Sequence, residues 1–320
     1  MNRGARIYVA GGRTLLGAAL LDRLRAGDHR NLVGVPPDEP DLTDEGQVED
    51  FFGGTRPEYV FVAAGRSGGI QLNQARPADL MLDNLLTTAH VLRSAHAHGV
   101  TKLLYLASSC SYPRHAPQPL SVESLMTGVL EPTNAAYATA KLAGWQLCAA
   151  YRQQYGACFL TAIPANTFGP QDEFDPDGGH VIPALIRKMH VAKVRDEPEV
   201  SVWGTGTPRR EFLYAPDLAD ACLFIMRHYD GPAPINLGGG ETLSVAEVAR
   251  AVAEVVGYGG RLRFDPARPD GMPLKALDSG PLRALGWRPS TDFRTALAET
   301  YSWFLHHVIK EDRTHVRGAV

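Results

Sequence analysis

Tyr137 and Lys141 place a phenol and an ammonium four residues apart in a segment of helical period. Residues at that spacing lie on one face of a helix, so the two groups can act together. A cation beside a phenol favours its ionised form and brings a pKa of about 10 closer to working pH. Such a phenol can pass a proton to a ketone that is being reduced. Taken alone, the pair also fits a surface tyrosine beside a lysine stem.

Ser108 follows an apolar run at 102–107 that predicts a strand. Ligands of doubly wound sheets collect at the carboxyl ends of the strands. A serine there can hydrogen-bond a substrate carbonyl, while Tyr137 protonates the developing alkoxide and Lys141 binds a nicotinamide ribose. The three residues together predict a ketone reductase.

A glycine-rich turn, Gly11-Gly12-Arg13-Thr14-Leu15-Leu16-Gly17, joins a predicted strand to a predicted helix. A dinucleotide pyrophosphate binds at such a helix N-terminus. Gly11 permits the tight turn and Gly17 lets the helix approach the sheet, but Thr14 replaces the usual middle glycine and can crowd the phosphates. A glycine turn without a ligand is the alternative, and the flanking strand and helix favour the dinucleotide site.

The second predicted strand ends at Val35-Pro36-Pro37, which carries neither the acidic residue typical of NAD sites nor the arginine typical of NADP sites. Arg13 is the best nearby cation for a 2′-phosphate, although it also fits a solvated turn residue. We therefore favour NADP(H) and leave NAD(H) open.

These residues need a scaffold, and the first half of the chain alternates short apolar runs with longer helical segments. That alternation predicts an α/β fold, a doubly wound parallel sheet of the Rossmann type with helices on both faces. The predicted strands are 6–10, 31–35, 59–63, 102–107 and 159–163, and the main predicted helices are 15–25, 78–98 and 135–155.

After Pro170 the composition becomes rich in Pro, Gly and Asp, which predicts a loop at 171–179 and a domain boundary. A helix at 182–189, a strand at 235–237 that returns to the main sheet, and helices at 245–256 and 293–306 follow. We assign 1–169 and 211–240 to the dinucleotide-binding domain, 170–210 and 241–310 to a smaller α/β substrate-binding lobe, and 311–320 to a flexible polar tail.

Composition narrows the class of partner. Lysine plus arginine total 32 against 35 for aspartate plus glutamate, so no global positive field exists to recruit nucleic acid or an anionic membrane. The four cysteines form no CxxC pair and follow no apolar signal segment, which favours a reducing compartment. No apolar run reaches the roughly 20 residues of a membrane helix. We expect a soluble cytoplasmic protein without a metal site.

Beyond these motifs, nearly the whole chain resembles the GDP-L-fucose synthase family of extended short-chain dehydrogenases. That family epimerises and reduces GDP-4-keto-6-deoxymannose. The resemblance is carried by the segments Ser108-Ser109-Cys110-Ser111-Tyr112-Pro113, Glu131-Pro132-Thr133-Asn134, Tyr137 to Lys141, His180-Val181-Ile182-Pro183-Ala184-Leu185, Trp203-Gly204-Thr205-Gly206-Thr207-Pro208 and Arg268-Pro269-Asp270-Gly271.

The resemblance implies that Cys110 is the base that removes protons at C3 and C5, and that His180 returns them from the opposite face. A carbonyl acidifies its neighbouring protons, so a thiolate facing an imidazole can exchange them. Outside this family context, a cysteine after a strand is more often buried filler, and a histidine before an Ile-Pro helix is more often a capping or core residue.

The resemblance also implies binding residues. Lys188, Trp203, Arg210 and Asp270 fall on positions that hold the GDP moiety, although Trp203 also fits ordinary core packing. Three departures concern the cofactor and the sugar: Thr14 and Val35-Pro36-Pro37 in the cofactor loops, and Lys188 in place of an arginine. The remaining cofactor contacts that we assign are Asp41, Pro164, Ala165, Asn166, Thr167 and His180, with Ala165 in place of a family threonine.

Our leading hypothesis is 3,5-epimerisation followed by NADPH-dependent 4-keto reduction of a GDP-4-keto-6-deoxyhexose. One alternative keeps the fold but only reduces, or only epimerises, another nucleotide-linked deoxysugar or heptose. Another is a non-catalytic NADP sensor, which has no need of Ser108, Cys110, Tyr137, Lys141 and His180 together. By analogy with the family, a homodimer forms through the helices at 78–98 and 135–155, which pack as a four-helix bundle.

Overall fold

The computed structural model describes residues 1–317, with side chains to residue 310. Its larger unit is built on a six-stranded sheet in which every neighbouring pair of strands is parallel. The strand order is β2-β1-β3-β4-β5-β9, so the chain reverses direction across the sheet after β2. The strands are β1 (Ile7–Ala10), β2 (Leu32–Val33), β3 (Tyr59–Val62), β4 (Lys102–Leu106), β5 (Phe159–Pro164) and β9 (Ile235–Leu237).

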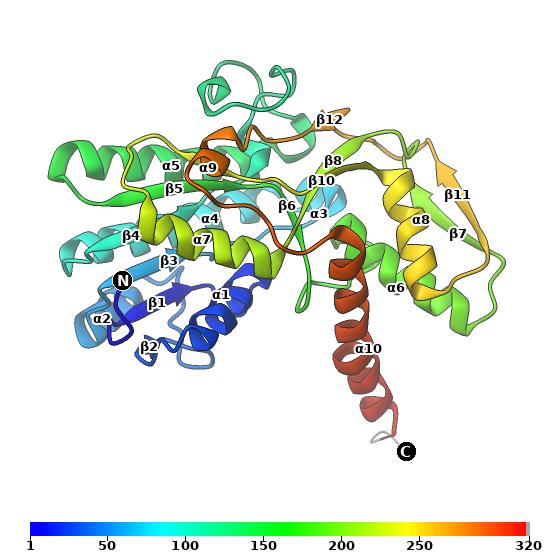
Figure 1. Ribbon diagram of the computed structural model, residues 1–320, viewed down its shortest axis with the longest axis horizontal. Helices are drawn as coiled ribbons and strands as arrows, with labels where there is room; N and C mark the ends of the chain where they lie inside the picture. The colour runs from blue at the N-terminus through cyan, green and yellow to red at the C-terminus, as the bar shows by residue number, and fades with distance from the viewer. Residues whose placement is uncertain (318–320) are drawn as a thin grey trace.

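Helices cover both faces of this sheet. Helix α1 (Leu15–Ala26) connects strands in one direction across the sheet, whereas α2 (Glu45–Thr55), α4 (Pro77–Ala97) and α5 (Ala135–Tyr155) connect them in the other. Right-handed crossovers therefore place the two sets on opposite faces. Helix α7 (Ala215–His228) packs beside α1, and α4 packs beside α5 (Figure 1). The doubly wound architecture is confirmed, as is the return of 235–237 to the main sheet.

A second group of elements packs around its own apolar core, at the right of Figure 1. Strand β8 (Arg209–Tyr214) pairs with β10 (Glu241–Ser244), β12 (Leu274–Lys275) and β6 (Asn166–Phe168), and β7 (Glu199–Trp203) pairs with β11 (Arg261–Asp265). Helices α6 (Val181–Val194), α8 (Val245–Val256) and α10 (Phe293–Arg317) complete the lobe. Strand β8 spans the predicted domain boundary at residues 210 and 211. Shorter pieces are α3 (Ile70–Ala75), α9 (Gly280–Ala284), η1 (Ser109–Ser111), η2 (Val122–Ser124) and η3 (Pro132–Asn134).

Three predicted elements differ clearly in length from the structure. Helix α6 spans Val181–Val194, whereas the sequence predicts 182–189. Strand β2 keeps only Leu32–Val33 of the predicted 31–35, because Gly34 adopts φ +62° and Pro36 has no N–H to donate to a ladder. Helix α10 runs to Arg317 instead of ending near 306, so it enters the segment predicted as a polar tail. Residues 318–320 of that segment lie outside the described residues. None of the helices in the described chain is long and apolar enough to cross a membrane.

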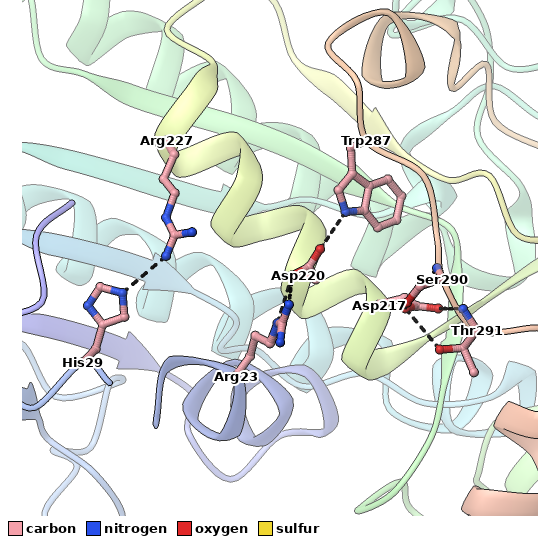
Figure 2. Close-up of polar contacts among 8 residues, drawn as sticks. All are labelled: Arg23, His29, Asp217, Asp220, Arg227, Trp287, Ser290 and Thr291. Carbon is pink, nitrogen blue, oxygen red and sulfur yellow. Dashed lines mark hydrogen bonds and ion pairs between the residues drawn. The ribbon is translucent and has the colours of Figure 1, made fainter. Parts of the chain in front are cut away.

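Helix α7 fastens the two units through its carboxylates (Figure 2). Asp217 accepts hydrogen bonds from the backbone N–H and hydroxyl groups of Ser290 and Thr291, just before α10. Asp220 accepts from Arg23 of α1 at 2.9 Å and from the Trp287 indole at 3.0 Å. These bonds fix the segment that enters the smaller lobe against the larger one.

Candidate active site

A cavity of about 700 Å³ lies where the carboxyl edge of the main sheet meets the smaller lobe. Its wall is contributed by both units, from the glycine-rich turn at one end to β7 and the 269–272 segment at the other. Asp41, Gly11, Gly12 and Gly17 are the predicted site residues that do not line it. The predicted residues that do are Arg13, Thr14, Leu15, Leu16, Ser108, Cys110, Tyr137, Lys141, Pro164, Ala165, Asn166, Thr167, His180, Lys188, Trp203, Arg210 and Asp270.

The glycine-rich turn is closed so tightly that two of its glycines admit no side chain. Gly11 has φ +86°, and a Cβ there would lie 2.5 Å from the Ala64 Cα. A Cβ on Gly17 would overlap the carbonyl oxygen of Gly11. The turn therefore needs glycine at both positions, because only then does the N-terminus of α1 come up against the end of β1.

Thr14 caps helix α1. Its hydroxyl accepts a hydrogen bond from the Gly17 N–H at 3.1 Å and donates to the Gly11 carbonyl at 2.8 Å. A side-chain oxygen in this role satisfies one of the free N–H groups of the first turn. The threonine that replaces the usual glycine thus has a structural reason to be there.

Glu39 reaches the glycine-rich turn from the loop after β2, and the sequence analysis missed it. Its carboxylate accepts hydrogen bonds from the Gly11 N–H and from the Tyr8 hydroxyl, the latter at 3.3 Å. Burial raises the pKa of Glu39, against the lowering effect of these bonds. Glu39 lies two residues beyond Val35-Pro36-Pro37, where the second strand is predicted to end. The neighbouring Asp41 is exposed and accepts from Thr43 at 2.7 and 2.9 Å.

Ser108, Tyr137 and Lys141 come together beside the end of β4. Ser108 hydrogen-bonds Tyr137, and the Lys141 Nζ lies 5.9 Å from the Tyr137 ring centroid. That ammonium donates to the carbonyls of Leu106 at 3.3 Å and Ala64 at 3.4 Å. Burial lowers the pKa of Lys141 to about 8.

The expected lowering of the Tyr137 pKa is absent. Burial raises the pKa of Tyr137, the Cys110 charge raises it further, and the Ser108 hydrogen bond opposes both. The reason is that Lys141 is directed at two backbone carbonyls, so desolvation of the phenol dominates. Tyr137 is therefore protonated near neutral pH, which suits a proton donor.

Cys110 and His180 face the same cavity from different elements. The Cys110 sulfur accepts from the Asn134 side-chain amide at 3.2 Å and from the Lys275 Nζ at 3.7 Å. His180 stands at the N-cap position of α6 without making a side-chain cap bond, so capping is not its role. The imidazole is open to the cavity, yet desolvation by the surrounding chain, and then the Lys275 charge, lower the pKa of His180.

The far end of the cavity is rich in cations and carries one indole. Trp203 has the Lys188 Nζ at 5.3 Å from its ring centroid and the Arg268 guanidinium at 4.6 Å. Arg210 donates to the Asp270 backbone carbonyl at 3.2 Å, and burial lowers the pKa of Arg210. The Asp270 carboxylate is bound by the Thr205 N–H and hydroxyl, both at 2.8 Å.

Asn134, Arg268 and Lys275 lie in or beside this cavity and had no assigned role in the sequence analysis. Asn134 and Arg268 lie inside motif segments that carry the resemblance, so their positions gave a signal. Lys275 gave none, because it is a single lysine in a two-residue strand, 165 residues from Cys110.

Residues 7–238 match the model of the NAD dependent epimerase/dehydratase family. GDP-L-fucose synthase 1 of Arabidopsis thaliana is 47% identical over 307 residues, which cover 96% of this chain and 95% of that protein.

Two solved structures extend the comparison. A GDP-L-fucose synthetase from Naegleria fowleri bound to NADP has a TM-score of 0.88 at 28% identity, covering 96% of each chain. The GDP-mannoheptose C4 reductase from Campylobacter jejuni with NADP bound has a TM-score of 0.86 at 32% identity, covering 95% of this chain and 99% of that one.

Proposed function

The chain belongs to the NAD dependent epimerase/dehydratase family, and we propose that it epimerises C3 and C5 of a GDP-4-keto-6-deoxyhexose and then reduces C4 with NADPH, as a GDP-L-fucose synthase does. One observation carries the proposal: two sets of catalytic side chains line the same cavity. Cys110 and His180 can exchange protons at carbon, and the ketone-reducing set is Ser108, Tyr137 and Lys141. Two successive reactions on one sugar need both sets within reach of the same bound substrate.

The residues at the glycine-rich turn fit NADP(H). The turn leaves no room for side chains at Gly11 and Gly17, and the N-terminus of α1 faces the cavity, as a pyrophosphate requires. Arg13 is exposed on the cavity wall, where its charge can meet a 2′-phosphate. When bound, NADPH supplies the hydride for C4. We assign the nicotinamide contacts to Pro164, Ala165, Asn166 and Thr167, and we keep Asp41 as an adenosine contact.

In the reduction step the chain supplies a proton and orients a carbonyl. Ser108 donates to the C4 oxygen, and Tyr137, protonated near neutral pH, transfers its proton as that oxygen becomes an alkoxide. Lys141, held by the carbonyls of Ala64 and Leu106, stands ready to bind the nicotinamide ribose.

In the epimerisation step the chain moves protons between two faces of the sugar. The C4 carbonyl acidifies the hydrogens at C3 and C5, and Cys110 accepts each of them. His180 donates a proton to the other face. Desolvation, and then the Lys275 charge, lower the pKa of His180, which makes its imidazolium a stronger acid. The Ser108 contact to the C4 oxygen stabilises the enolate in both rounds.

The cationic end of the cavity suits a guanosine diphosphate. Lys188 and Arg210 can neutralise the pyrophosphate, and Trp203 offers a flat apolar face for the nucleoside. Asp270 is held in place by Thr205 and can accept from the nucleoside.

Solvent exchange tests the proposed function. The protein is incubated with GDP-4-keto-6-deoxymannose in D2O without NADPH, and mass spectrometry follows label at C3 and C5. We expect two deuterium atoms with the parent protein and none with Cys110→Ser. A parent protein that oxidises NADPH but introduces no label would be a reductase only, the activity in the name of the similar GDP-mannoheptose C4 reductase.

We also propose that the protein is a cytoplasmic homodimer. The four cysteines are free in the structure, which supports a reducing compartment. Helices α4 and α5 pack side by side, and α4 leaves Leu82 56% exposed on its outer surface. Two such pairs would form a four-helix bundle. Light scattering is expected to give twice the chain mass, and a monomer at micromolar concentration would refute the dimer.

A further inference from the structure

Lys275 is a buried ammonium directed at the sulfur of Cys110. It lies on β12, where it is paired in register with Arg210 of β8, and it keeps 9% of its exposure. Its Nζ is 3.7 Å from the Cys110 Sγ. The cavity wall thus has a lysine that neither the sequence motifs nor the proposed steps have used.

No carboxylate neutralises this ammonium among the described residues, and its contact with Cys110 is its only hydrogen bond within them. Lys102 provides a contrast at the same burial, because it binds Asp230 at 2.5 Å and the Tyr229 carbonyl at 2.8 Å. A buried charge without a counter-ion is strongly unfavourable. A thiolate at Cys110 would provide the missing negative charge.

A second donor converges on the same sulfur. The Asn134 side-chain amide lies 3.2 Å from the Cys110 Sγ, while the Cys110 N–H donates to the Ser108 hydroxyl at 3.2 Å. A thiol sulfur is a weak acceptor, whereas a thiolate accepts strongly. Two donors at one sulfur therefore match the anion.

Resting on the proposed function, we propose that Lys275, assisted by Asn134, is the positioning residue that holds Cys110 as a thiolate aimed at the sugar. The thiolate takes a proton from C3 or C5: the C–H bond breaks, an S–H bond forms, and the electron pair remains on the sugar as an enolate. An N–H bond of His180 then breaks as a C–H bond forms on the opposite face. Water restores both groups between rounds, and Lys275 gains and loses no proton.

The surrounding charges agree with this arrangement. Arg210 adds a second positive charge near Cys110, and the carboxylates of Asp270 and Glu131 raise the pKa of Arg210. Tyr137 faces the sulfur as a neutral phenol. Burial lowers the pKa of Lys275, and the Cys110 charge opposes that effect.

Lys275 also lowers the pKa of His180, so it acts on both members of the acid/base pair. Loss of its charge is expected to move the thiolate limb and the imidazolium limb of a pH profile in the same, alkaline, direction. A merely structural lysine would change the height of the profile and leave its position unchanged.

Alkylation of Cys110 by iodoacetamide, followed by peptide mass spectrometry at pH 5 to 10, tests the proposal without any sugar nucleotide. Lys275→Met removes the charge and keeps the length, Lys275→Arg keeps the charge, and Lys193→Met removes a lysine that donates to Val256 away from the cavity. We expect Lys275→Met to move the midpoint up by at least about one pH unit and to slow alkylation at pH 7 about tenfold. Lys275→Arg should recover most of that rate, and Lys193→Met should match the parent.

A Lys275→Met profile that superimposes on the parent profile would overturn the proposal. Thiolate absorbance at 240 nm gives a measurement that needs no lysine variant. The parent is expected to show a step below about pH 8.5, the midpoint of free cysteine, that Cys110→Ser removes. Absence of that step also overturns the proposal. Neither result depends on turnover, so failure of the deuterium test would refute the proposed function alone.

Discussion

Two sets of carboxyl and amide groups in this protein differ in how far they are hydrogen-bonded within the chain. At the seam around α7, Asp217 receives four hydrogen bonds, and Asp220 is bound by Arg23 and Trp287 (Figure 2). In the cavity, buried atoms have no partner within the described residues. They are Asn134 Oδ1 and Asp172 Oδ2.

The difference separates structural from functional polar groups. Buried polar atoms in folded proteins are almost always paired, and one left unpaired lowers stability. Groups that are paired within the chain hold the two units at a fixed distance, whereas groups unpaired at a cavity wall are available to a ligand. Removing a seam residue should therefore reduce stability and spare the chemistry, and removing a cavity residue should do the reverse.

Tyr137→Phe is expected to have the largest effect. Loss of the proton donor should lower the rate of NADPH oxidation by about 10²–10⁴-fold, because general acid catalysis contributes that much. Deuterium exchange at C3 and C5 should survive, since Cys110 and His180 remain. The thermal midpoint should stay within the parent range, because a half-buried ring is retained. Equal loss of exchange and reduction would contradict the separate roles.

Asp217→Ala is the counterpart at the seam. It leaves the donors of Ser290 and Thr291 without their acceptor, and we expect a loss of about 3 kcal/mol in the free energy of unfolding. Urea denaturation measures the loss, with exposed Asp22→Ala as the control, expected within about 0.5 kcal/mol of the parent. The kcat of the folded fraction should be unchanged. A stable variant with impaired turnover would break the comparison.

Local patterns were sufficient to predict much of the scaffold. Helices α5 and α8 begin and end where helical periodicity places them, and each is followed by a glycine in the left-handed region. The candidate site residues were recognisable because a motif carries its own spacing, as Tyr137 and Lys141 do. Strand β2 was overestimated, since composition does not reveal the conformation of Gly34.

Pairings between distant segments could not be predicted. Nothing local indicates that Lys275 meets Cys110 or that Asp217 meets Ser290, because such contacts depend on how two units pack. The burial of Asp172 is equally hidden, since the residue stands in a polar stretch that reads as a surface loop. Tertiary contacts, which no short window contains, decide which polar residues are paired.

Asp172→Asn sharpens the comparison through pH. Burial raises the pKa of Asp172 to about 7, so the folded protein holds this proton more tightly than the unfolded chain. Its contribution to stability is complete below about pH 4 and is lost as the pH rises through 7. Asparagine has no such proton to release. The variant should match the parent near pH 4 and exceed it by roughly 2 kcal/mol at pH 8 in urea titrations.

The sign of that difference is the critical readout. Removing the fully paired Asp217 is expected to destabilise the protein, whereas neutralising Asp172, whose Oδ2 has no partner among the described residues, is expected to stabilise it. A variant Asp172→Asn that is less stable than the parent at pH 8 would show that the single hydrogen bond from the Glu173 N–H, at 2.8 Å, is enough to stabilise the carboxylate form. The Asp22→Asn variant serves as the pH control, since its carboxylate is exposed on α1.

Substitution of Thr14 is expected to have the smallest effect. Its hydroxyl is hydrogen-bonded within the chain, as Asp217 is, although Thr14 lines the cavity. Thr14→Val keeps the branched shape and removes the capping hydroxyl, so stability should fall by about 1 kcal/mol, whereas Thr14→Gly should cost only a few tenths. If the hydroxyl only caps α1, calorimetry should find NADPH affinity within about threefold of the parent for Thr14→Gly. A tenfold tighter complex would instead mean that the branched side chain crowds the pyrophosphate, and that the cap is maintained at the expense of cofactor binding.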